Sequence, residues 1–129
     1  MVTGGAGFIG SHLVDALISA GKKVRVLDNF SSGRMEFLEG HSKDDLEIVV
    51  CDLLDPSGVD DAMKGIDTVH HLAANPDIRL GVQVTDTDLK QGTIATYNIL
   101  ESMRKSGVSK ISFSSSSAIY GEADEMPTS

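Results

Sequence analysis

Short β-branched runs alternate along the chain with longer segments in which apolar residues recur at helical spacing. Such alternation is typical of βαβ units and of a parallel sheet. It predicts five strands, at residues 1–3, 23–28, 46–51, 68–72 and 110–114. We therefore expect an α/β protein built on a doubly wound parallel sheet.

Two segments have the period of an amphipathic helix. The first runs from about Phe8 to Ala20, before Gly21, and its apolar stripe consists of Ile9, Leu13, Ala16, Leu17 and Ala20. The second runs from about Thr87 to Ser106, before Gly107, and its stripe consists of Leu89, Thr93, Thr96, Leu100 and Met103. The acidic stretch between residues 36 and 67 predicts one strand with short connecting turns around it.

The segment Thr3-Gly4-Gly5-Ala6-Gly7-Phe8-Ile9-Gly10 lies between the first predicted strand and the first predicted helix. Its glycines fit a dinucleotide-binding loop in two registers, one starting at Gly4 and the other at Gly5, both continuing with Gly7 and Gly10. Without side chains the backbone can approach a diphosphate, and the N–H groups of the helix start supply donors and a partial positive charge. A tight turn without a ligand is the alternative, but the strand-to-helix context favours the dinucleotide site.

Asp28 stands eighteen residues after Gly10, at the end of the second predicted strand. A carboxylate there accepts hydrogen bonds from adenosine ribose hydroxyls and repels a 2′-phosphate, which favours NAD over NADP. Arg34 can in principle offset that repulsion, and the plain alternative for Asp28 is a turn-forming acid before Asn29. Asp52, one residue past the third predicted strand, is placed either to meet the adenine or to begin a turn.

The composition argues against several classes of partner. Nineteen acidic and eleven basic residues give a net charge of −8, so the chain lacks the cationic surface that nucleic acid binding needs. The longest apolar run, residues 48–51, is far too short to span a bilayer, and the N-terminus has no basic leader before a long apolar stretch. Cys51 is the one cysteine and is expected to be a small buried residue in a reducing compartment. We expect a cytoplasmic protein with no membrane partner.

The histidines do not form a metal-ligand pattern. His70 and His71 are adjacent on a predicted strand and therefore point to opposite faces. His12 and His41 have no partner at ligand spacing. We expect no bound metal.

Five segments carry a family resemblance: TGGAGFIGSHLVDAL, LDNFSSG, CDLLD, HLAANPDIR and FSSSSAIYGEADEMP. In this order and spacing the chain resembles the extended short-chain dehydrogenase/reductases and, among them, nucleotide-sugar epimerases of the UDP-glucose 4-epimerase type. The resemblance covers essentially all 129 residues. It implies the N-terminal part of a Rossmann-type fold, NAD as cofactor, a nucleotide sugar (foremost a UDP-sugar) as substrate, and a homodimer of the full-length protein, formed through the helix after the fourth strand and the helix that carries the family's tyrosine.

The resemblance also implies a set of cofactor-binding residues. In chain order they are Gly4, Gly7, Phe8, Ile9, Gly10, Asp28, Asn29, Ser32, Gly33, Asp52, Leu53, Leu72, Ala73, Ala74 and Ser114. Backbone groups of residues 7–10 would hold the pyrophosphate, residues 28–33 would surround the adenosine ribose, and residues 52–53 would contact the adenine. Residues 72–74 would line the path to the nicotinamide, with Ser114 beside it.

Ser116, four residues before Tyr120, matches the family's catalytic serine or threonine and would hydrogen-bond the sugar 4-hydroxyl. The family's base, the tyrosine of a Tyr-x-x-x-Lys motif, has no match here, because Glu101 follows Tyr97 by four residues and Asp124 follows Tyr120. We expect that motif and the substrate lobe to lie beyond these residues. The chain is therefore expected to be a dinucleotide-binding domain truncated at both ends, monomeric or prone to aggregate, and without turnover of its own.

The family's dehydratases carry an Asp-Glu pair after the catalytic threonine, where this chain has Ser117 and Ala118. The resemblance therefore favours epimerisation at C4 of the UDP-glucose/UDP-galactose type, through a transient 4-keto intermediate. A nucleotide-sugar reductase, a decarboxylase and a non-catalytic NAD-binding module stay open as alternatives. Gly92 replaces an asparagine common in the family, and Ser112 in the fifth predicted strand indicates a position near a sheet edge.

Overall fold

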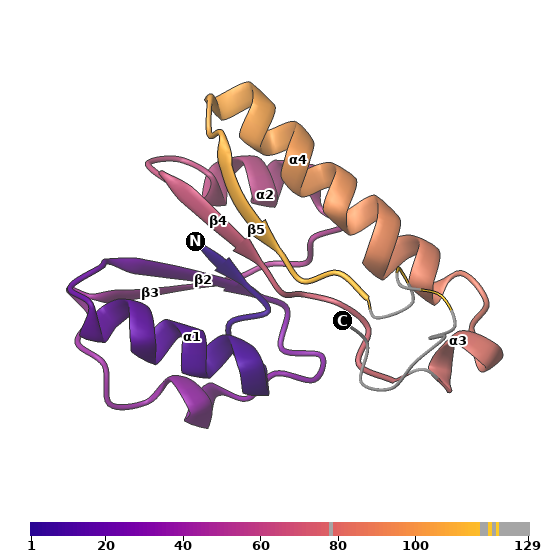
Figure 1. Cartoon of the computed structure of the whole chain (residues 1–129), viewed down its shortest axis with the longest axis horizontal. Helices are drawn as coiled ribbons and strands as arrows, with labels where there is room; N and C mark the ends of the chain where they lie inside the picture. The colour runs from indigo at the N-terminus through magenta and orange to yellow at the C-terminus, as the bar shows by residue number, and fades with distance from the viewer. Residues whose placement is uncertain (78, 117–118, 120, 122–129) are drawn as a thin grey trace.

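The computed structural model describes residues 1–77, 79–116, 119 and 121. Its centre is a five-stranded sheet in the order β3-β2-β1-β4-β5, with every pair parallel (Figure 1). The strands are β1 (Val2–Thr3), β2 (Val24–Asp28), β3 (Leu46–Val50), β4 (Thr68–His71) and β5 (Lys110–Phe113). Each boundary lies within one residue of its prediction, so the α/β, Rossmann-type doubly wound fold is confirmed.

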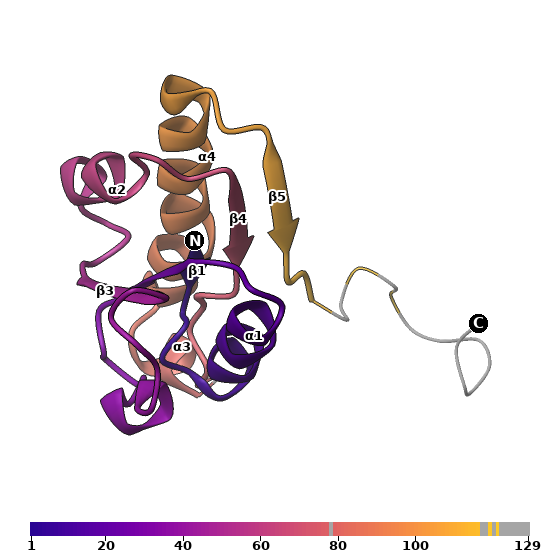
Figure 2. The ribbon, with the colours of Figure 1, turned by 90° about the vertical axis from the view of Figure 1, so that its left-hand side faces the viewer.

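Helices cover both faces of the sheet (Figure 2). The helix α1 (Phe8–Ser19) and the 3-10 turn η1 (Met35–Leu38) pack on one face, and α2 (Pro56–Ala62) and α4 (Ala95–Ser106) pack on the other. Between the long elements lie a short helix, α3 (Leu80–Gln83), and a π-helical turn, η2 (Leu89–Ile94). Side chains alternate across the strands, so that Val26 joins the core under α1 whereas Leu27 joins the core under α4.

The helix α1 buries a different stripe from the predicted one. Its buried residues are Gly10, Ser11 and Val14, with Leu13, Leu17 and Ile18 half-buried beside them. Ile9 is 69% exposed, and Ala16 and Ala20 are exposed as well, so the prediction was wrong for these three. The small residues Gly10 and Ser11 let the helix lie close to the preceding loop, which turns Ile9 away from the core.

The helix α4 also turns an unexpected face to the sheet. Its buried residues are Ala95, Asn98, Ile99, Ser102 and Met103. Of the predicted stripe only Met103 is buried, whereas Leu89 and Leu100 are 55% and 47% exposed. The amide of Asn98 donates to the Leu53 carbonyl (2.8 Å), so this face is fixed by a buried hydrogen bond as well as by packing.

The π turn η2 explains part of this difference. A π-helical turn closes from residue i to i+5, so a stripe predicted with 3.6 residues per turn loses its phase across it. Gly92 lies within this turn, where a Cβ atom would meet nothing within 4 Å.

The helix α2 was not predicted; only connecting turns were expected there. Its start has an ordinary signal, because Asp55 accepts the backbone N–H of Ser57 (3.1 Å) and Pro56 occupies the first turn. At the other end, the guanidinium of Arg25 donates to the carbonyl of Ala62 (2.7 Å) and thereby ties the helix to β2.

The strand β5 is an edge strand in the described sheet, and all four of its residues are exposed. This agrees with the prediction from Ser112. No helix in the described ranges is both long and apolar enough to cross a membrane.

Candidate functional site

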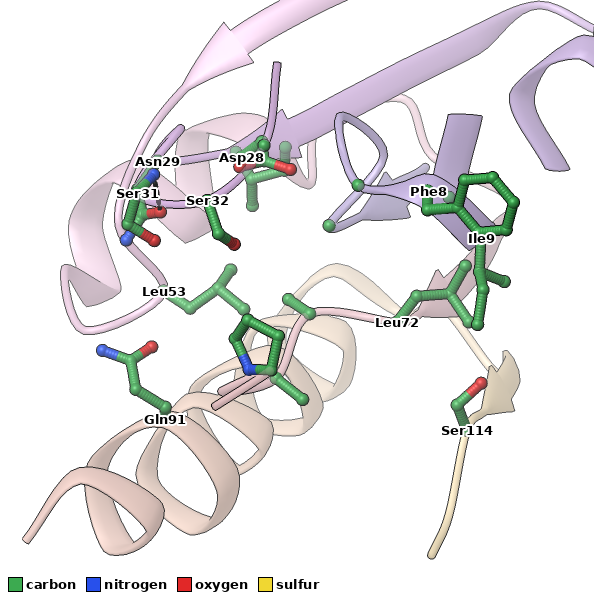
Figure 3. Close-up of a pocket in the computed structure, with 18 of the residues that line it drawn as sticks. Phe8, Ile9, Asp28, Asn29, Ser31, Ser32, Leu53, Leu72, Gln91 and Ser114 are labelled. Atoms are coloured by element: carbon green, nitrogen blue, oxygen red, sulfur yellow. Dashed lines mark hydrogen bonds between the residues drawn. The ribbon is translucent and has the colours of Figure 1, made fainter. Parts of the chain in front are cut away.

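A cavity of about 380 Å³ opens at the carboxyl ends of the strands, where the strand order reverses between β1 and β4 (Figure 3). All predicted cofactor residues except Asp52 line it. These are Gly4, Gly7, Phe8, Ile9, Gly10, Asp28, Asn29, Ser32, Gly33, Leu53, Leu72, Ala73, Ala74 and Ser114. Two walls face each other. The glycine wall is formed by Gly4 and residues 7–10, 28–29 and 31–33, and the apolar wall by Leu53, residues 72–74 and Pro76. The carboxyl ends of parallel strands at such a switch point are the common ligand site of doubly wound folds.

The loop before α1 uses each glycine for a different reason. Gly4 has φ +68°, and a Cβ there would lie 2.8 Å from the backbone N and Cα of Ala73. A Cβ on Gly10 would overlap the carbonyl oxygen of Gly4, whereas one on Gly7 would meet only that same oxygen at 3.3 Å. Gly5 is buried against Val26 and does not line the cavity. The register of Gly4, Gly7 and Gly10 is therefore the one that faces the cavity.

The N-terminus of α1 is left open to the cavity. Gly7 is the N-cap residue, so no side chain caps the helix, and its first turn contains no acidic residue. The first N–H groups of a helix have no intrahelical acceptor and carry the positive end of the helix dipole. Phe8 and Ile9 border the opening with side chains that are 72% and 69% exposed. Such an end suits a phosphate or diphosphate group.

The carboxylate of Asp28 is held in place by two backbone N–H groups. Ala6 donates to Oδ2 (3.0 Å), and Phe30 donates to Oδ1 (2.9 Å). Phe30 has φ +56°, a strained conformation for a bulky residue, and its ring packs against the core under α1. Arg34 is exposed and lies outside the cavity lining, and its backbone N–H donates to the Ala6 carbonyl (2.9 Å). The acidic group that favours NAD is thus fixed beside the glycine loop.

Asp52 does not line this cavity as predicted. Its Oδ2 accepts the amide of Asn29 (3.1 Å), and its Oδ1 accepts the N–H of Leu54 (2.9 Å). The residue instead borders a second cavity, of about 540 Å³, between β2, β3 and α2. The hydrogen bond between Asn29 and Asp52 holds the loop after β3 against the loop after β2.

Five lining residues were missed by the sequence analysis: Leu27, Ser31, Cys51, Pro76 and Gln91. Four of them lie in segments quoted for the resemblance, Leu27 and Ser31 in LDNFSSG, Cys51 in CDLLD and Pro76 in HLAANPDIR, so these could have been found. Gln91 lies on the π turn and adds a carboxamide below the apolar wall (Figure 3). No sequence signal marked it, because the predicted helix was treated as a regular α-helix.

Ser116, the one predicted catalytic residue, is not among the residues that line the cavity. It is exposed and accepts the N–H of Ile119 with its carbonyl (3.2 Å). Tyr97 is 63% exposed on α4 and is also not among the lining residues. Four further positions of the sequence analysis, Ser117, Ala118, Tyr120 and Asp124, lie outside the described residues.

The thiol of Cys51 lies between the two cavities and is half-buried rather than fully buried. It donates to the Asp52 carbonyl (3.3 Å). Burial, followed by the charges of Asp55 and Asp52, raises the pKa of the thiol. The thiol is therefore neutral near pH 7 and a weak nucleophile.

His12 and His41 share a partner, since Asp15 lies 4.0 Å from His12 Nδ1 and 2.7 Å from His41 Nε2. The contact joins α1 to the loop after η1. Within the described part of the chain, no group of three or more His, Cys, Asp or Glu side chains is arranged to hold a metal ion.

The profile of the NAD dependent epimerase/dehydratase family matches residues 1–129. A UDP-glucose 4-epimerase of Halalkalibacterium halodurans is 38% identical over 133 residues, which cover 98% of this chain and 37% of that protein. A UDP-N-acetyl-alpha-D-glucosaminuronate decarboxylase of Bacillus cytotoxicus is 33% identical over 122 residues, which cover 95% of this chain and 37% of that protein.

Solved structures share the same architecture. The Thermus thermophilus UDP-glucose 4-epimerase, solved as a complex with NAD, superposes with a TM-score of 0.84 at 36% identity. The superposition covers 98% of this chain and 42% of that one. This chain thus spans about two fifths of the length of the proteins it matches.

Proposed function

The chain belongs to the NAD-dependent epimerase/dehydratase family, and we propose that its cavity binds NAD and serves the epimerisation of a UDP-sugar at C4. One observation carries the proposal: the cavity extends from Asp28, past the open N-terminus of α1, to Ser114. A dinucleotide has the matching order of parts, with a diphosphate between two nucleosides. The strand-order reversal is also where doubly wound folds bind dinucleotides.

Each part of the wall supports one part of the cofactor. Backbone N–H groups of residues 7–10 donate to the diphosphate at the positive end of α1. Asp28 accepts hydrogen bonds from the ribose hydroxyls of the adenosine, and its charge disfavours the 2′-phosphate of NADP. Leu53 packs against the adenine, and the small residues 73–74 leave room for the nicotinamide ribose. The hydroxyl of Ser114 lies at the nicotinamide end.

When bound, NAD supplies the oxidised nicotinamide that takes a hydride from sugar C4 and returns it to the opposite face. Within this chain, Ser116 is the residue proposed to hydrogen-bond the sugar 4-hydroxyl during that transfer. The group that takes the hydroxyl proton is not supplied by Tyr97 or Tyr120, because neither has a lysine four residues later. We therefore expect the 129-residue chain to bind NAD without turning over substrate.

A nucleotide-sugar decarboxylase is the second candidate. The Bacillus cytotoxicus decarboxylase is 33% identical across 95% of this chain, close to the identity of the epimerases. The dinucleotide half of the site can serve either reaction, so the choice between them depends on residues that contact the sugar.

We also propose that the outer face of α4 contributes to a homodimer. Tyr97 and Leu100 of α4 and Ile94, the last residue of η2 just before it, recur every three residues and are 63%, 47% and 39% exposed. Large apolar side chains grouped on an exposed helix face indicate a protein contact.

The reaction is tested with the protein in its natural full length. Incubation with UDP-glucose should give UDP-galactose, identified by the stereochemistry at C4 in NMR spectra. Release of CO₂ from UDP-glucuronic acid would instead favour the decarboxylase. No product from any UDP-sugar, in a protein that binds NAD, would contradict both reactions and favour a non-catalytic NAD-binding module.

A further inference from the structure

A buried imidazole joins four elements beneath the cavity. His71, the last residue of β4, is 1% exposed. Its Nδ1 lies 2.7 Å from the hydroxyl of Thr3 on β1, and its Nε2 lies 3.0 Å from the hydroxyl of Thr96 on α4. Its ring stacks on Phe113 of β5, with 5.7 Å between the centroids and 22° between the planes. Both ring nitrogens are therefore used, and each one holds a different element.

The protons of this network can be assigned from the groups that surround it. The hydroxyl oxygen of Thr3 also accepts the backbone N–H of Ala73 (3.4 Å), and we assign its own proton to the bond with Nδ1 of His71. The ring proton then lies on Nε2 and is donated to Thr96. Burial lowers the pKa of His71, so the neutral ring that this assignment requires is the form present near pH 7.

The two threonines lie differently with respect to the cavity. Thr3 directly precedes Gly4, and His71 directly precedes residues 72–74 of the apolar wall. Gly4 and Ala73 are packed so closely that a Cβ on the glycine would lie 2.8 Å from the Ala73 backbone. The hydroxyl of Thr3 thus joins the His71 ring and the Ala73 N–H at the base of the two walls. Thr96 ties the ring to the helix behind it and does not line the cavity.

Backbone pairing alone holds this junction weakly. The strand β1 has only two residues in the sheet, which pair with His70 and His71 of β4. Beyond them, the Leu72 N–H donates to the Thr3 carbonyl (3.2 Å). The Ser114 N–H donates to the His71 carbonyl (3.2 Å), so the same residue also fixes the nicotinamide end of the cavity.

We propose that His71 is a positioning residue: through Thr3 it sets the distance between the glycine loop and the apolar wall, and with it the fit of the dinucleotide's diphosphate. This rests on the proposed function, because the occupant is taken to be NAD. The role differs from a general contribution to stability, since it assigns the Thr3 side of the ring to ligand binding and the Thr96 side to anchoring.

Two isosteric variants separate these roles. Thr3→Val and Thr96→Val each remove one hydroxyl from the same imidazole, and each leaves one ring nitrogen without its partner. Thr3→Val also removes the acceptor of the Ala73 N–H, so the histidine variants below, which keep that acceptor, test the ring itself. Both should lower the Tm by several degrees. Calorimetry with NAD, at a temperature where circular dichroism shows both variants folded, should give a Kd about tenfold higher for Thr3→Val and within about twofold of the unaltered chain for Thr96→Val.

Variants of the histidine provide a rescue. His71→Asn keeps a polar group near the Nδ1 position and should retain NAD affinity within about threefold. His71→Gln keeps a polar group near the Nε2 position, and its NAD affinity should fall about tenfold, as in Thr3→Val. If NAD affinity fell equally in the two histidine variants, or equally in the two valine variants, the proposal would be overturned. The network would then act through stability alone.

Hydrogen exchange gives a readout that does not depend on NAD. The amides of residues 4–7 should exchange faster in Thr3→Val than in Thr96→Val when both are compared with the unaltered chain. If the unaltered chain binds no NAD, the proposed function fails, and this exchange difference alone decides whether His71 positions the loop. Identical exchange at residues 4–7 in the two variants would overturn that role.

Discussion

The glycine wall and the apolar wall of the cavity are held in place by different forces. In the glycine wall, hydrogen bonds fix the polar groups: two backbone N–H groups hold Asp28, and the open end of α1 presents its amides. In the apolar wall, close packing, as at Ala73 against Gly4, acts together with the hydrogen bonds of Thr3 and His71 beneath it. The first wall therefore decides which chemical groups are recognised, whereas the second decides how wide the cavity is. Substitutions in the two walls should therefore affect NAD binding in different ways.

The largest expected effect separates two glycines of the same loop. Gly10→Ala should destabilise the fold by about 3 kcal/mol or more, because the new Cβ overlaps the Gly4 carbonyl oxygen. Gly7→Ala should cost less than about 1 kcal/mol, because its Cβ meets only that oxygen at 3.3 Å and its backbone is extended. It should still weaken NAD binding about tenfold, since a methyl group then stands where the diphosphate approaches.

Urea unfolding and calorimetry measure the two quantities separately. A Gly10→Ala chain as stable as the unaltered one, or a Gly7→Ala chain with unchanged NAD affinity, would contradict the division of roles within this loop.

The next effect tests recognition by the glycine wall. Asp28→Asn removes the charge and keeps an oxygen that can accept one of the two backbone N–H groups. NAD affinity should fall about tenfold, and the preference for NAD over NADP should shrink by at least about tenfold, since the 2′-phosphate is no longer repelled. Asp61→Asn, at an exposed acidic residue beside the second cavity, is the control and should change neither affinity. An unchanged preference in Asp28→Asn would place the discrimination elsewhere.

The strands and the glycine wall could be predicted from the sequence because local signals define them. β1 is followed by Gly4 and β2 ends at Asp28, and most residues that line the switch point follow the ends of strands. Asp28 and the glycine loop are of this kind. The helix α2 has a local signal too, in Asp55 and Pro56, and was missed because Gly58 and the surrounding acidic residues resemble a loop.

The helix faces and several lining residues could not be predicted because they depend on contacts between distant segments. Apolar side chains occur on two faces of α4, and the small residues Ala95 and Ser102, rather than Leu100, lie on the buried one. The π turn shifts the helical phase of the apolar stripe that was predicted across it. It also brings Gln91 to the cavity. Asp52 turns away because Asn29, 23 residues earlier in the chain, binds its carboxylate.

A smaller effect concerns the junction under the apolar wall and depends on pH. Burial lowers the pKa of His71 below its usual 6.5. As the pH falls through 6.5, the unfolded chain takes up a proton on this residue before the folded chain does. The stability it contributes is therefore complete above pH 6.5 and is lost as the pH falls from there toward the folded-state pKa, by at most about 1.4 kcal/mol per pH unit.

Urea unfolding at a series of pH values between about 5 and 8 measures this slope. His71→Asn should flatten it in part. The remainder is expected from His70, whose pKa is lowered by burial and then by the N-terminal ammonium group. A slope that His71→Asn leaves unaltered would contradict a neutral, buried ring at this junction.

The smallest effect lies outside both walls. Gly92→Ala should stabilise the chain by about 0.5–1 kcal/mol, because a Cβ there meets nothing and alanine is the better helix former. NAD affinity should stay within about twofold, as Gly92 is not among the lining residues. Gly21→Ala is the matched comparison: its surroundings are equally open, but φ is +73°, so the substitution should destabilise instead. Stabilisation at both positions would contradict the backbone geometry described here.

The central claim is that the cavity at the strand-order reversal holds NAD with its diphosphate at the N-terminus of α1. Titration of the isotopically labelled 129-residue chain with NAD, followed by the NMR shifts of backbone amides, tests it most directly. The account predicts the largest changes at residues 7–10, with further changes at residues 28–33 and 72–74, and none around Glu47, Asp55 and Asp61 of the second cavity. An absence of changes, or changes confined to the second cavity, would contradict it.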